Sequence, residues 1–429
     1  MNLETRKVGF KSYYLVVFFL AALAAVALLT LDNGSGIVEK RNMGVAANNK
    51  AKAESNEEKI IELVSECNLF SGRWVFGKAS SSSSSSSYPP YEEGQCSYMT
   101  PEFACQRNGR PDSKYQGWKW QPRGCDLPRF NGTALMEALR GKRLVFVGDS
   151  LNRNQWVSML CLIESSSSLR HSTVIRDGNQ FTFHAPEYNS TIDFYWSPLL
   201  VESNCDDPME HKVKQRIVKI KAIEKHGRHW TDADILVFDS FIWWLQPSMT
   251  ILWGGSFSPG SSDASYKQVV EGMEKRVYEM ALDTWSDWVE FNVNRTRTKM
   301  FFMSLSPMHP YGESLDVLQH CYNETEPTLE EDGYRGRRRV ETFPDDFGLI
   351  AQSAIQKLAR RGVRVEYLNI THLSDYRKDA HPSIYTYDFQ KEADPRKRSR
   401  HSDCGHWCLP GVPDVWNQIL YSYIINSSS

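Results

Sequence analysis

Apolar residues follow two patterns that alternate along this chain after residue 125. Short apolar runs at 143–147, 234–239, 299–304 and 363–368 predict β-strands. Longer segments, in which apolar residues recur every three or four positions, predict helices at 151–160, 266–293, 348–361 and 411–425. Strands that are separated by helices favour parallel pairing, with helices on both faces of the sheet. The pattern therefore predicts an α/β fold with a mainly parallel sheet.

The segment from residue 67 to residue 125 has a different composition. Tryptophan, tyrosine and cysteine stand there among proline and glycine, and neither a helical nor a strand period dominates. A polar stretch at 32–66 precedes it, and an unbroken serine run at 80–87 interrupts it. We expect a flexible stem at 32–66, followed by a loop-rich segment at 67–125 that disulfides hold to the α/β body.

An uncharged apolar run extends from residue 13 to residue 31 and follows the basic residues Arg6, Lys7 and Lys11. The run is long enough to cross a bilayer, and the basic residues favour a cytosolic amino terminus. The run therefore predicts a transmembrane signal anchor at 13–31, with a cytosolic tail at 1–12 and a lumenal body. A cleaved signal peptide is the alternative, because alanine is frequent at 21–27.

Cysteines and glycosylation sequons both favour an oxidising, lumenal compartment. The chain has nine cysteines, so at least one stays free or pairs between chains, and the sequence alone leaves their connectivity open. Together with the predicted anchor, the sequons favour a glycoprotein with disulfide bonds. The formal net charge of −2 gives no electrostatic reason to expect nucleic acid as a partner. The sequons begin at Asn33, Asn131, Asn189, Asn294, Asn323, Asn369 and Asn426.

Two short segments far apart in the sequence supply the side chains of an acyl-transfer site. The first, Leu144-Val-Phe-Val-Gly-Asp-Ser150, places Ser150 at a strand-to-helix turn, where the amides that open the helix can stabilise an oxyanion. The second, Asp403-Cys-Gly-His406, puts a carboxylate three residues from an imidazole. We expect Ser150 to be the nucleophile, His406 the base that takes its proton, and Asp403 the group that orients His406.

Each of these segments also has a plainer interpretation. Gly-Asp-Ser is common in turns, where Asp149 and Ser150 would merely cap the helix. Near the carboxyl terminus, a cluster of cysteine and histidine has the composition of a zinc site, and its members are Cys404, His406, Cys408 and His401. A lumenal compartment favours disulfides over zinc, so we predict no metal site.

Several longer motifs occur in order from residue 67 to the carboxyl terminus. They are Cys67-Asn-Leu-Phe-Ser-Gly-Arg-Trp-Val, Asn108-Gly-Arg-Pro-Asp, Trp118-Lys-Trp-Gln-Pro, Cys125-Asp-Leu-Pro-Arg-Phe, Val147-Gly-Asp-Ser-Leu-Asn-Arg153, Cys321-Tyr-Asn-Glu-Thr-Glu-Pro, Asp379-Ala-His-Pro-Ser and Asp403-Cys-Gly-His-Trp-Cys-Leu-Pro-Gly-Val-Pro-Asp-Val-Trp-Asn417. Together these motifs resemble the plant trichome birefringence-like family of polysaccharide O-acetyltransferases.

The resemblance implies an SGNH/GDSL-like fold over residues 126–429 and a single-pass type II topology in the Golgi membrane. It implies transfer of acetyl groups, through an acetyl-serine, onto a cell-wall polysaccharide such as xylan. The acetyl donor would be a co-substrate, acetyl-CoA or another carrier, and no cofactor would stay bound. By position, the family's nucleophile, base and orienting acid fall on Ser150, His406 and Asp403. The resemblance also implies the disulfides Cys67–Cys125 and Cys96–Cys161 and leaves the other five cysteines open.

One residue departs from the family pattern. This chain reads Phe238-Asp-Ser-Phe-Ile-Trp-Trp244, whereas the family usually has asparagine at position 239, which resembles an oxyanion donor of related hydrolases. An ionised Asp239 cannot donate a hydrogen bond to an oxyanion. Either Asp239 is protonated, or it has another role, or the oxyanion depends on backbone amides in the region of Gly148.

Candidate substrate-binding residues lie beside these motifs. Asn152 and Arg153 follow the nucleophile, and Arg153 would hold the donor or an anionic group from one helical turn along. Trp243 and Trp244 follow a predicted strand and would stack on sugar rings. The plainer interpretations are a solvated helix charge for Arg153 and core packing for one of the tryptophans.

Other features leave the substrate and the reaction open. Basic stretches at 335–339 and 396–400 would attract glucuronate-bearing xylan or the phosphates of a CoA donor if they lined the groove. An esterase that removes acetyl groups would use the same three side chains. A polysaccharide-binding protein without catalytic activity is a further alternative, because Asp239 departs from the family pattern.

Overall fold

The computed structural model describes residues 67–77, 88–167, 169, 171–246, 248–253, 267–309, 321–328, 345–387 and 402–426. Several predicted segments lie outside these residues: the tail, anchor and stem within 1–66, the serine run at 80–87, and the basic stretches at 335–339 and 396–400. Within the described ranges, no helix combines the length and the apolar character that a membrane span requires.

The main sheet has seven strands in the order β12-β11-β8-β3-β6-β5-β4. The first five in that order run parallel, whereas β5 and β4 are antiparallel to their neighbours. All four predicted strands are present, but the sheet is mixed rather than parallel throughout. The strands are β3 (Arg143–Gly148), β4 (Thr173–Asp177), β5 (Gln180–Ala185), β6 (Ser190–Trp196), β8 (Ile235–Asp239), β11 (Lys299–Met303) and β12 (Glu366–Leu368).

The antiparallel edge of the sheet arises from a hairpin that the sequence pattern did not predict. Gly178 and Asn179 connect β4 to β5, and Gly178 has a φ of 55°. A two-residue connection with positive φ reverses the chain direction at once, so the strands that it joins pair antiparallel. The next strand, β6, pairs with both β5 and β3 and so joins this hairpin to the parallel part.

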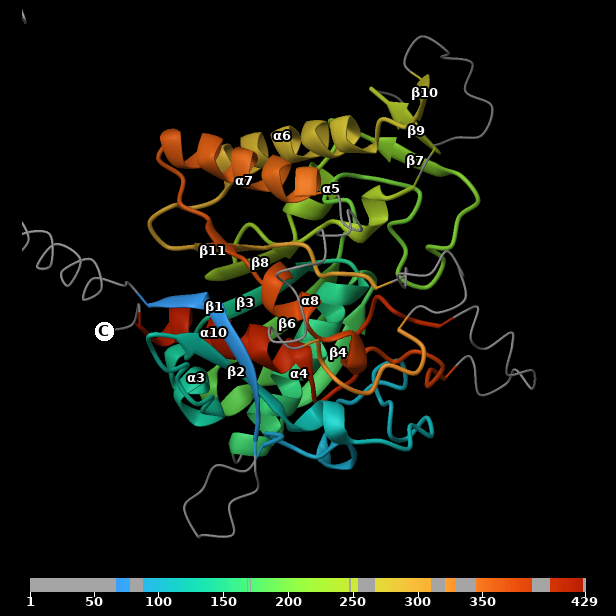
Figure 1. The fold of residues 1–429 in the computed structure, drawn as a ribbon. Helices are drawn as coiled ribbons and strands as arrows, with labels where there is room; N and C mark the ends of the chain where they lie inside the picture. The colour runs from blue at the N-terminus through green and yellow to red at the C-terminus, as the bar shows by residue number, and fades with distance from the viewer. Residues whose placement is uncertain are drawn as a thin grey trace, which may run out of the picture. The chain divides into compact units, whose positions relative to one another are not determined.

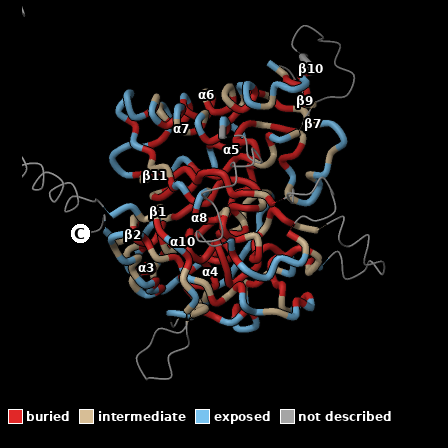
Figure 2. Tube along the Cα trace, viewed as in Figure 1, coloured by how far each residue is buried: buried red, intermediate tan, exposed pale blue. Residues whose placement is uncertain are grey.

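Helices cover both faces of the main sheet, with α3, α4 and α10 on one side and α6 and α7 on the other (Figure 1). The side chains of β3 alternate between two hydrophobic cores: Leu144 and Phe146 belong to one, and Val145 and Val147 belong to the other. A strand that is buried on both faces therefore reads as an unbroken apolar run. Buried residues concentrate along the strands and the inner sides of the helices (Figure 2).

The predicted helices at 151–160, 348–361 and 411–425 are found as parts of α4, α7 and α10. The described helices are α3 (Gly132–Ala138), α4 (Ser150–Ser166), α5 (Glu224–Gly227), α6 (Glu274–Asn292), α7 (Asp345–Arg360), α8 (Thr371–Asp375) and α10 (Val412–Asn426).

The predicted helix at 266–293 is wrong in its first part. Residues Lys267–Glu271 form strand β10, which pairs antiparallel with β9 (Ser248–Leu252), and α6 begins only at Glu274. Gly272, with a φ of 62°, separates the strand from the helix because an α-helix does not continue through a left-handed residue. β9 also pairs with β7 (Arg216–Lys219) to complete a small three-stranded sheet.

Disulfides hold the 67–125 segment to the α/β body, as predicted, but the segment is not wholly irregular. β1 (Asn68–Phe76) pairs antiparallel with β2 (Trp118–Arg123), and the pattern did not reveal this because the two strands are far apart in the sequence. Cys205 is free and buried. The disulfides are Cys67–Cys125 and Cys96–Cys161, which the family resemblance implied, together with Cys105–Cys408 and Cys321–Cys404.

Candidate active site

Ser150 is the first residue of α4 and follows the end of β3 by two positions. Asp149 caps this helix, and its Oδ1 accepts a hydrogen bond from the Leu151 amide at 2.9 Å. A Cβ on Gly148 would lie 2.3 Å from the Asp239 carbonyl oxygen, so only glycine lets β3 and β8 approach so closely there. The capping interpretation therefore holds for Asp149 but not for Ser150, which the turn presents at the carboxyl edge of the parallel strands.

Ser150, His406 and Asp403 form a continuous chain of hydrogen bonds. Ser150 Oγ lies 2.7 Å from His406 Nε2, and His406 Nδ1 lies 2.8 Å from Asp403 Oδ2. Asp403 Oδ1 also accepts hydrogen bonds from the Gly405 and His406 amides, at 3.1 and 3.0 Å. A carboxylate only accepts, so Nδ1 of His406 carries the proton and Nε2 is left to accept the proton of Ser150.

The charges of this site favour an ionised Asp403. Burial raises the pKa of Asp403, but the His406 charge and the hydrogen bonds from the His406 ring and the loop amides bring this pKa far below its usual range. Burial lowers the pKa of His406, but the charge and hydrogen bond of Asp403 and the charge of Asp149 together raise it by more, so the net result is a raised pKa. His406 is 29% exposed and Asp403 25%, so substrate can reach the imidazole.

The loop that carries Asp403 and His406, residues 403–408, is anchored to four other parts of the chain. The Trp407 amide donates to Asn154 Oδ1 in α4 at 2.8 Å. Asp403 exchanges two backbone hydrogen bonds with Ser383, at 2.9 and 3.0 Å. Two disulfides, Cys321–Cys404 and Cys105–Cys408, join the loop to segments distant in the sequence. These anchors hold His406 opposite the start of α4.

The same disulfides account for the zinc-like cluster. Cys404 and Cys408 are bonded to other cysteines, His406 binds Ser150, and His401 lies outside the described residues. In the part of the chain that the structure describes, no three His, Cys, Asp or Glu side chains are grouped so as to hold a metal ion.

Two buried acidic side chains lie beside the nucleophile. Asp239 ends β8 and pairs with Gly148, the residue that precedes Asp149. Burial raises the pKa of Asp239 well above its ordinary value, and the neighbouring Asp149 raises it further. Burial also raises the pKa of Asp149 to about 7, against the hydrogen bond from the Leu151 amide. Two adjacent buried carboxylates do not both stay ionised, so the arrangement favours a protonated Asp239.

Arg153 lies near the nucleophile, in the first turn of α4. Its Nη2 is 2.7 Å from the Glu102 carboxylate, and its side chain is 26% exposed. The Arg153 guanidinium lies 5.7 Å from the centre of the Phe103 ring, and this ring is in turn 6.0 Å from the His406 ring. Glu102 and Phe103 belong to the 67–125 segment, so that segment supplies part of the wall of the site.

Two of the predicted substrate-binding residues are buried in the protein, so their prediction is wrong. Asn152 faces the sheet, where its amide nitrogen lies 3.5 Å from the Val237 carbonyl oxygen. Trp244 belongs to the core on the α6 side, and its indole N–H donates to Ser240 Oγ at 3.0 Å. Asn152 and Trp244 each follow a strand that ends near Ser150. In both cases the helical turn after that strand directs the side chain into the protein interior.

Trp243, by contrast, is only partly buried and belongs to a group of aromatic rings. Its ring centre lies 5.5 Å from those of Trp196 and His211. The Arg216 guanidinium lies 4.6 Å from the centre of the Trp243 ring. Trp243, Trp196, His211 and Arg216 are called the Trp243 cluster below.

The Trp243 cluster adjoins the 403–408 loop. A Cβ on Gly405 would lie 3.7 Å from Cδ1 of Ile242, the residue before Trp243. Burial lowers the pKa of His211, and the charge of Arg153 adds to this effect, so the cluster is also within electrostatic range of Arg153. One partly exposed tryptophan is thus next to the loop that carries His406.

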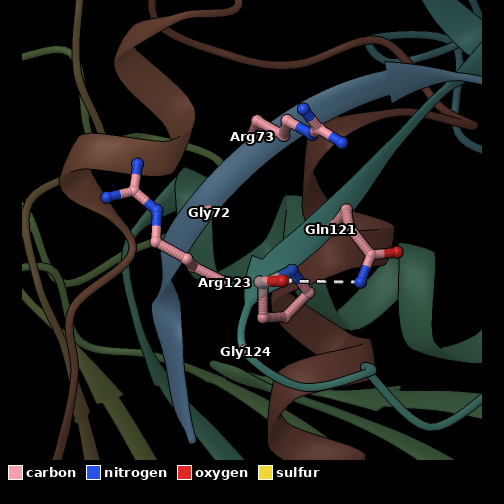
Figure 3. A pocket seen from close by; sticks show the side chains of 6 residues that line it. Gly72, Arg73, Gln121, Arg123 and Gly124 are labelled. Carbon is pink, nitrogen blue, oxygen red and sulfur yellow. Dashed lines mark hydrogen bonds between the residues drawn. The ribbon is translucent and has the colours of Figure 1, made fainter. Parts of the chain in front are cut away.

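A cavity of about 300 Å³ lies elsewhere, on the β1–β2 pair (Figure 3). Its lining consists of Gly72, Arg73, Gln121, Pro122, Arg123 and Gly124. These residues include neither a member of the Ser150–His406–Asp403 chain nor one of its direct neighbours. The cavity is therefore not the acyl-transfer site.

Sequence reasoning missed several residues that position the three catalytic candidates. Asn154 and Glu102 gave no signal beyond their polarity. His381 lies in the Asp379-Ala-His-Pro-Ser motif, which carried part of the family resemblance but no role. It contacts both the His406 carbonyl oxygen and His309, whose place in the sequence gave no signal.

Comparisons with known proteins place both parts of the chain. Residues 127–423 match the GDSL/SGNH-like acyl-esterase family found in Pmr5 and Cas1p, and residues 65–126 match the PMR5 N terminal domain. Xylan O-acetyltransferase 14 of Oryza sativa subsp. japonica is 44% identical over 380 residues, which cover 84% of this chain and 78% of the relative. Protein trichome birefringence-like 34 of Arabidopsis thaliana is 48% identical over 370 residues, 85% of this chain and 86% of the relative. Xylan O-acetyltransferase 13 of rice is 44% identical over 374 residues, 84% and 70% respectively.

Proposed function

Because the chain belongs to the trichome birefringence-like family of GDSL/SGNH-like proteins, we propose that it transfers acetyl groups onto the hydroxyls of a cell-wall polysaccharide. Two of the relatives are named xylan O-acetyltransferases, and xylan is the acceptor that we propose for this chain. The observation that carries the proposal is the unbroken hydrogen-bond chain from Ser150 through His406 to Asp403.

In the first half of the reaction, Ser150 Oγ attacks the carbonyl carbon of the acetyl donor, acetyl-CoA or another carrier. Nε2 of His406 takes the hydroxyl proton as the new C–O bond forms, and the Asp403 carboxylate stabilises the imidazolium. The bond between the acetyl group and the carrier then breaks, and the departing group receives the proton from His406. The enzyme is left with an acetyl ester on Ser150.

In the second half, a sugar hydroxyl attacks the acetyl-serine. His406 removes the proton of that hydroxyl and returns a proton to Ser150 Oγ as the ester bond to the serine breaks. A water molecule in place of the sugar would release acetate, which is the esterase reaction. Transfer and hydrolysis therefore differ in which hydroxyl lies within attack distance of the acetyl carbon.

The oxyanion that forms in both halves needs hydrogen-bond donors near Ser150. The first amides of a helix have no partner within the helix, but Asp149 already uses the Leu151 amide. We assign the oxyanion to the Ser150 amide and to a protonated Asp239, whose carboxyl then donates as the family's asparagine would. Gly148 contributes through its missing side chain, which lets β3 and β8 approach each other beside Ser150.

For the acceptor, the Trp243 cluster offers an aromatic surface beside the 403–408 loop, on which a xylose ring would stack. Arg153 would hold an anionic part of the donor or a glucuronate branch of the acceptor. We further propose a single-pass type II Golgi protein, anchored through residues 13–31, with its catalytic part in the lumen and without a bound cofactor. The apolar run preceded by basic residues supports the anchor and its orientation, and the Golgi is what the family resemblance implies.

The test is incubation of the purified full-length chain with acetyl-CoA or p-nitrophenyl acetate and xylo-oligosaccharides, followed by mass spectrometry of the acceptor. We expect acetylated xylo-oligosaccharide with the wild-type chain and none with Ser150→Ala. Release of acetate without acetylated product would identify an esterase. Binding of xylo-oligosaccharide without either product would identify a non-catalytic binding protein.

A further inference from the structure

Two buried histidines lie directly behind the 403–408 loop. His309 is 6% exposed and His381 is 1% exposed, and Nδ1 of His309 lies 2.6 Å from Nε2 of His381. Nδ1 of His381 lies 2.6 Å from the carbonyl oxygen of His406. At the other end, Nε2 of His309 lies 3.1 Å from the carbonyl oxygen of Asp375, the last residue of α8, and 3.4 Å from its carboxylate. The pair thus connects α8 to the backbone of the proposed base.

Hydrogen bonds link the pair to the 403–408 loop. A carbonyl oxygen only accepts hydrogen bonds, so Nδ1 of His381 donates to the His406 carbonyl oxygen. The other ring nitrogen of His381, Nε2, is then left to face Nδ1 of His309.

The groups around the pair favour a neutral His381. Burial lowers the pKa of His381 well below its ordinary value, and the charge of His309 lowers it further. The Asp375 carboxylate lies on the outer side of His309. His406 and Asp403 act on His381 with opposite signs from the 403–408 loop. His381 is then a neutral ring that accepts from His309 and donates to the His406 carbonyl oxygen.

Further contacts attach the 403–408 loop to the same two segments. The His309 amide donates to the Cys404 carbonyl oxygen at 3.1 Å. The His381 ring stacks on Trp407, with 4.0 Å between ring centres and 24° between planes, and the Trp407 indole donates to Ser306 Oγ at 2.9 Å. The two histidines are thus the polar part of a packed support under the loop.

We propose that His381, held by His309, is a positioning residue that fixes the His406 backbone so that the imidazole stays within hydrogen-bond distance of Ser150. This inference rests on the proposed function, because it concerns the same serine and base. Loss of the outer groups that orient metal-binding histidines typically lowers metal affinity or activity about 10–100-fold. We expect an effect of similar size here, where the oriented histidine is a base.

Amide side chains separate the two contacts of His381. The amide nitrogen of asparagine takes the place of Nδ1, so His381→Asn keeps the donor to the His406 carbonyl oxygen. The amide group of glutamine reaches the position of Nε2, where its oxygen can accept from His309, so His381→Gln keeps the contact with His309 but loses the donor to the His406 carbonyl oxygen. His184 is exposed on β5, and His184→Asn is the matched control.

The measurement is the rate at which a fluorophosphonate probe modifies Ser150, together with the melting temperature of each variant. We expect His184→Asn to equal the wild type, His381→Asn to stay within about threefold, and His381→Gln to fall by roughly tenfold or more. Modification of His381→Gln as fast as of His381→Asn, at equal melting temperature, would overturn the proposal.

A second readout is independent of any reaction at Ser150. In ¹⁵N spectra of the histidine-labelled full-length chain at pH 7, we expect the neutral pattern protonated at Nδ1 for His381. His381→Asn assigns the signal, and a His381 that is charged or that is protonated at Nε2 alone would overturn the proposal. A wild-type chain that the probe does not modify would contradict the proposed function. The spectra would then test only the arrangement of His309 and His381. Modification without acetyl transfer contradicts the transferase and leaves the positioning role supported.

Discussion

The Asp403 side chain makes more hydrogen bonds than those of Ser150 and His406, because it binds both the His406 ring and two loop amides. Asp403→Asn removes the charge and lets an amide N–H face Nδ1 of His406, which favours the wrong tautomer. We expect the rate of acetyl transfer to fall by roughly 10³–10⁴-fold, as when the carboxylate of a serine triad is replaced. The rate constant at saturating donor measures this, and a loss of less than tenfold would exclude Asp403 as the orienting group.

The raised pKa of His406 determines the acid side of the pH profile. His406 must be neutral to accept the proton of Ser150, so activity is present above its pKa and lost as the pH falls through it. We expect kcat/KM for the acetyl donor to decline below a pKa higher than the value of about 6.5 for an unperturbed histidine. A profile that stays flat from pH 7 to pH 5 would contradict a histidine base.

Asp239 gives a prediction that depends on its protonation. If its carboxyl donates to the oxyanion, Asp239→Asn keeps a donor at that position and stays within a few-fold of the wild-type rate. Asp239→Leu removes the donor and is expected to lower the rate by about 10²–10³-fold, the usual cost of one oxyanion donor. Equal and large losses in both variants would show that an ionised carboxylate is required.

The same substitution has a pH-dependent effect on stability. A carboxyl with a raised pKa in the folded state stabilises the fold at low pH, and this contribution is lost as the pH rises through the folded-state pKa. Asparagine does not titrate, so Asp239→Asn does not lose this contribution. The melting temperature of the variant minus that of the wild type should therefore increase from pH 5 to pH 9. A constant difference over this range would contradict the raised pKa.

At the scale of elements, the four predicted strands of the sheet were evident in the sequence because their residues are buried on both faces. β3, for example, sends Phe146 into one core and Val147 into the other, so every position is apolar. The pattern predicts helix at β10 because the Lys267–Glu271 run is short, does not alternate and leads almost directly into α6. Its pairing with β9 is a tertiary contact that no local period reveals.

The candidate site was likewise predictable where local motifs mark it, but not where it depends on tertiary contacts. Ser150, Asp403 and His406 lie in compact local motifs that the sequence singled out, and the structure brings the three side chains together. Their catalytic roles stay a prediction. Asn152 and Trp244 lie next to such motifs but face the interior, and burial of this kind depends on how a turn packs. Glu102, His309 and His381 reach the site from three other segments, and their approach depends on the whole fold.

Disulfides at two elements should have different effects on activity. Cys321–Cys404 anchors the loop next to Asp403, whereas Cys67–Cys125 joins the ends of the β1–β2 segment. Loss of either pair, as a double serine variant, should lower stability by about 2–5 kcal/mol. Only the Cys321/Cys404 variant should also lower the rate at which the fluorophosphonate probe modifies Ser150. This rate is measured at a temperature below the melting temperatures of both variants. Equal rates in the two variants would show that the disulfide does not hold the loop in its active geometry.

For the whole molecule, the two family-matched parts are one structural unit in the described residues. Trp74 and Phe103 of the amino-terminal segment share a core with Leu160 and Trp416 of the α/β body. The segment also supplies Glu102 and Phe103 to the wall of the site. It is therefore part of the enzyme that we propose rather than an appendage to it.

In the proposed reaction an acetyl group passes through Ser150, and isolation of the acetyl-serine tests this step. The full-length chain is exposed briefly to the acetyl donor, freed of excess donor, digested and examined by mass spectrometry. It is then chased with xylo-oligosaccharide or with buffer alone. We predict one acetyl group on the peptide that contains Ser150, lost to the oligosaccharide much faster than to water. An unmodified Ser150 in a chain that still acetylates xylan would contradict the acetyl-serine mechanism. An acetyl-serine that reacts only with water would contradict transfer to a polysaccharide.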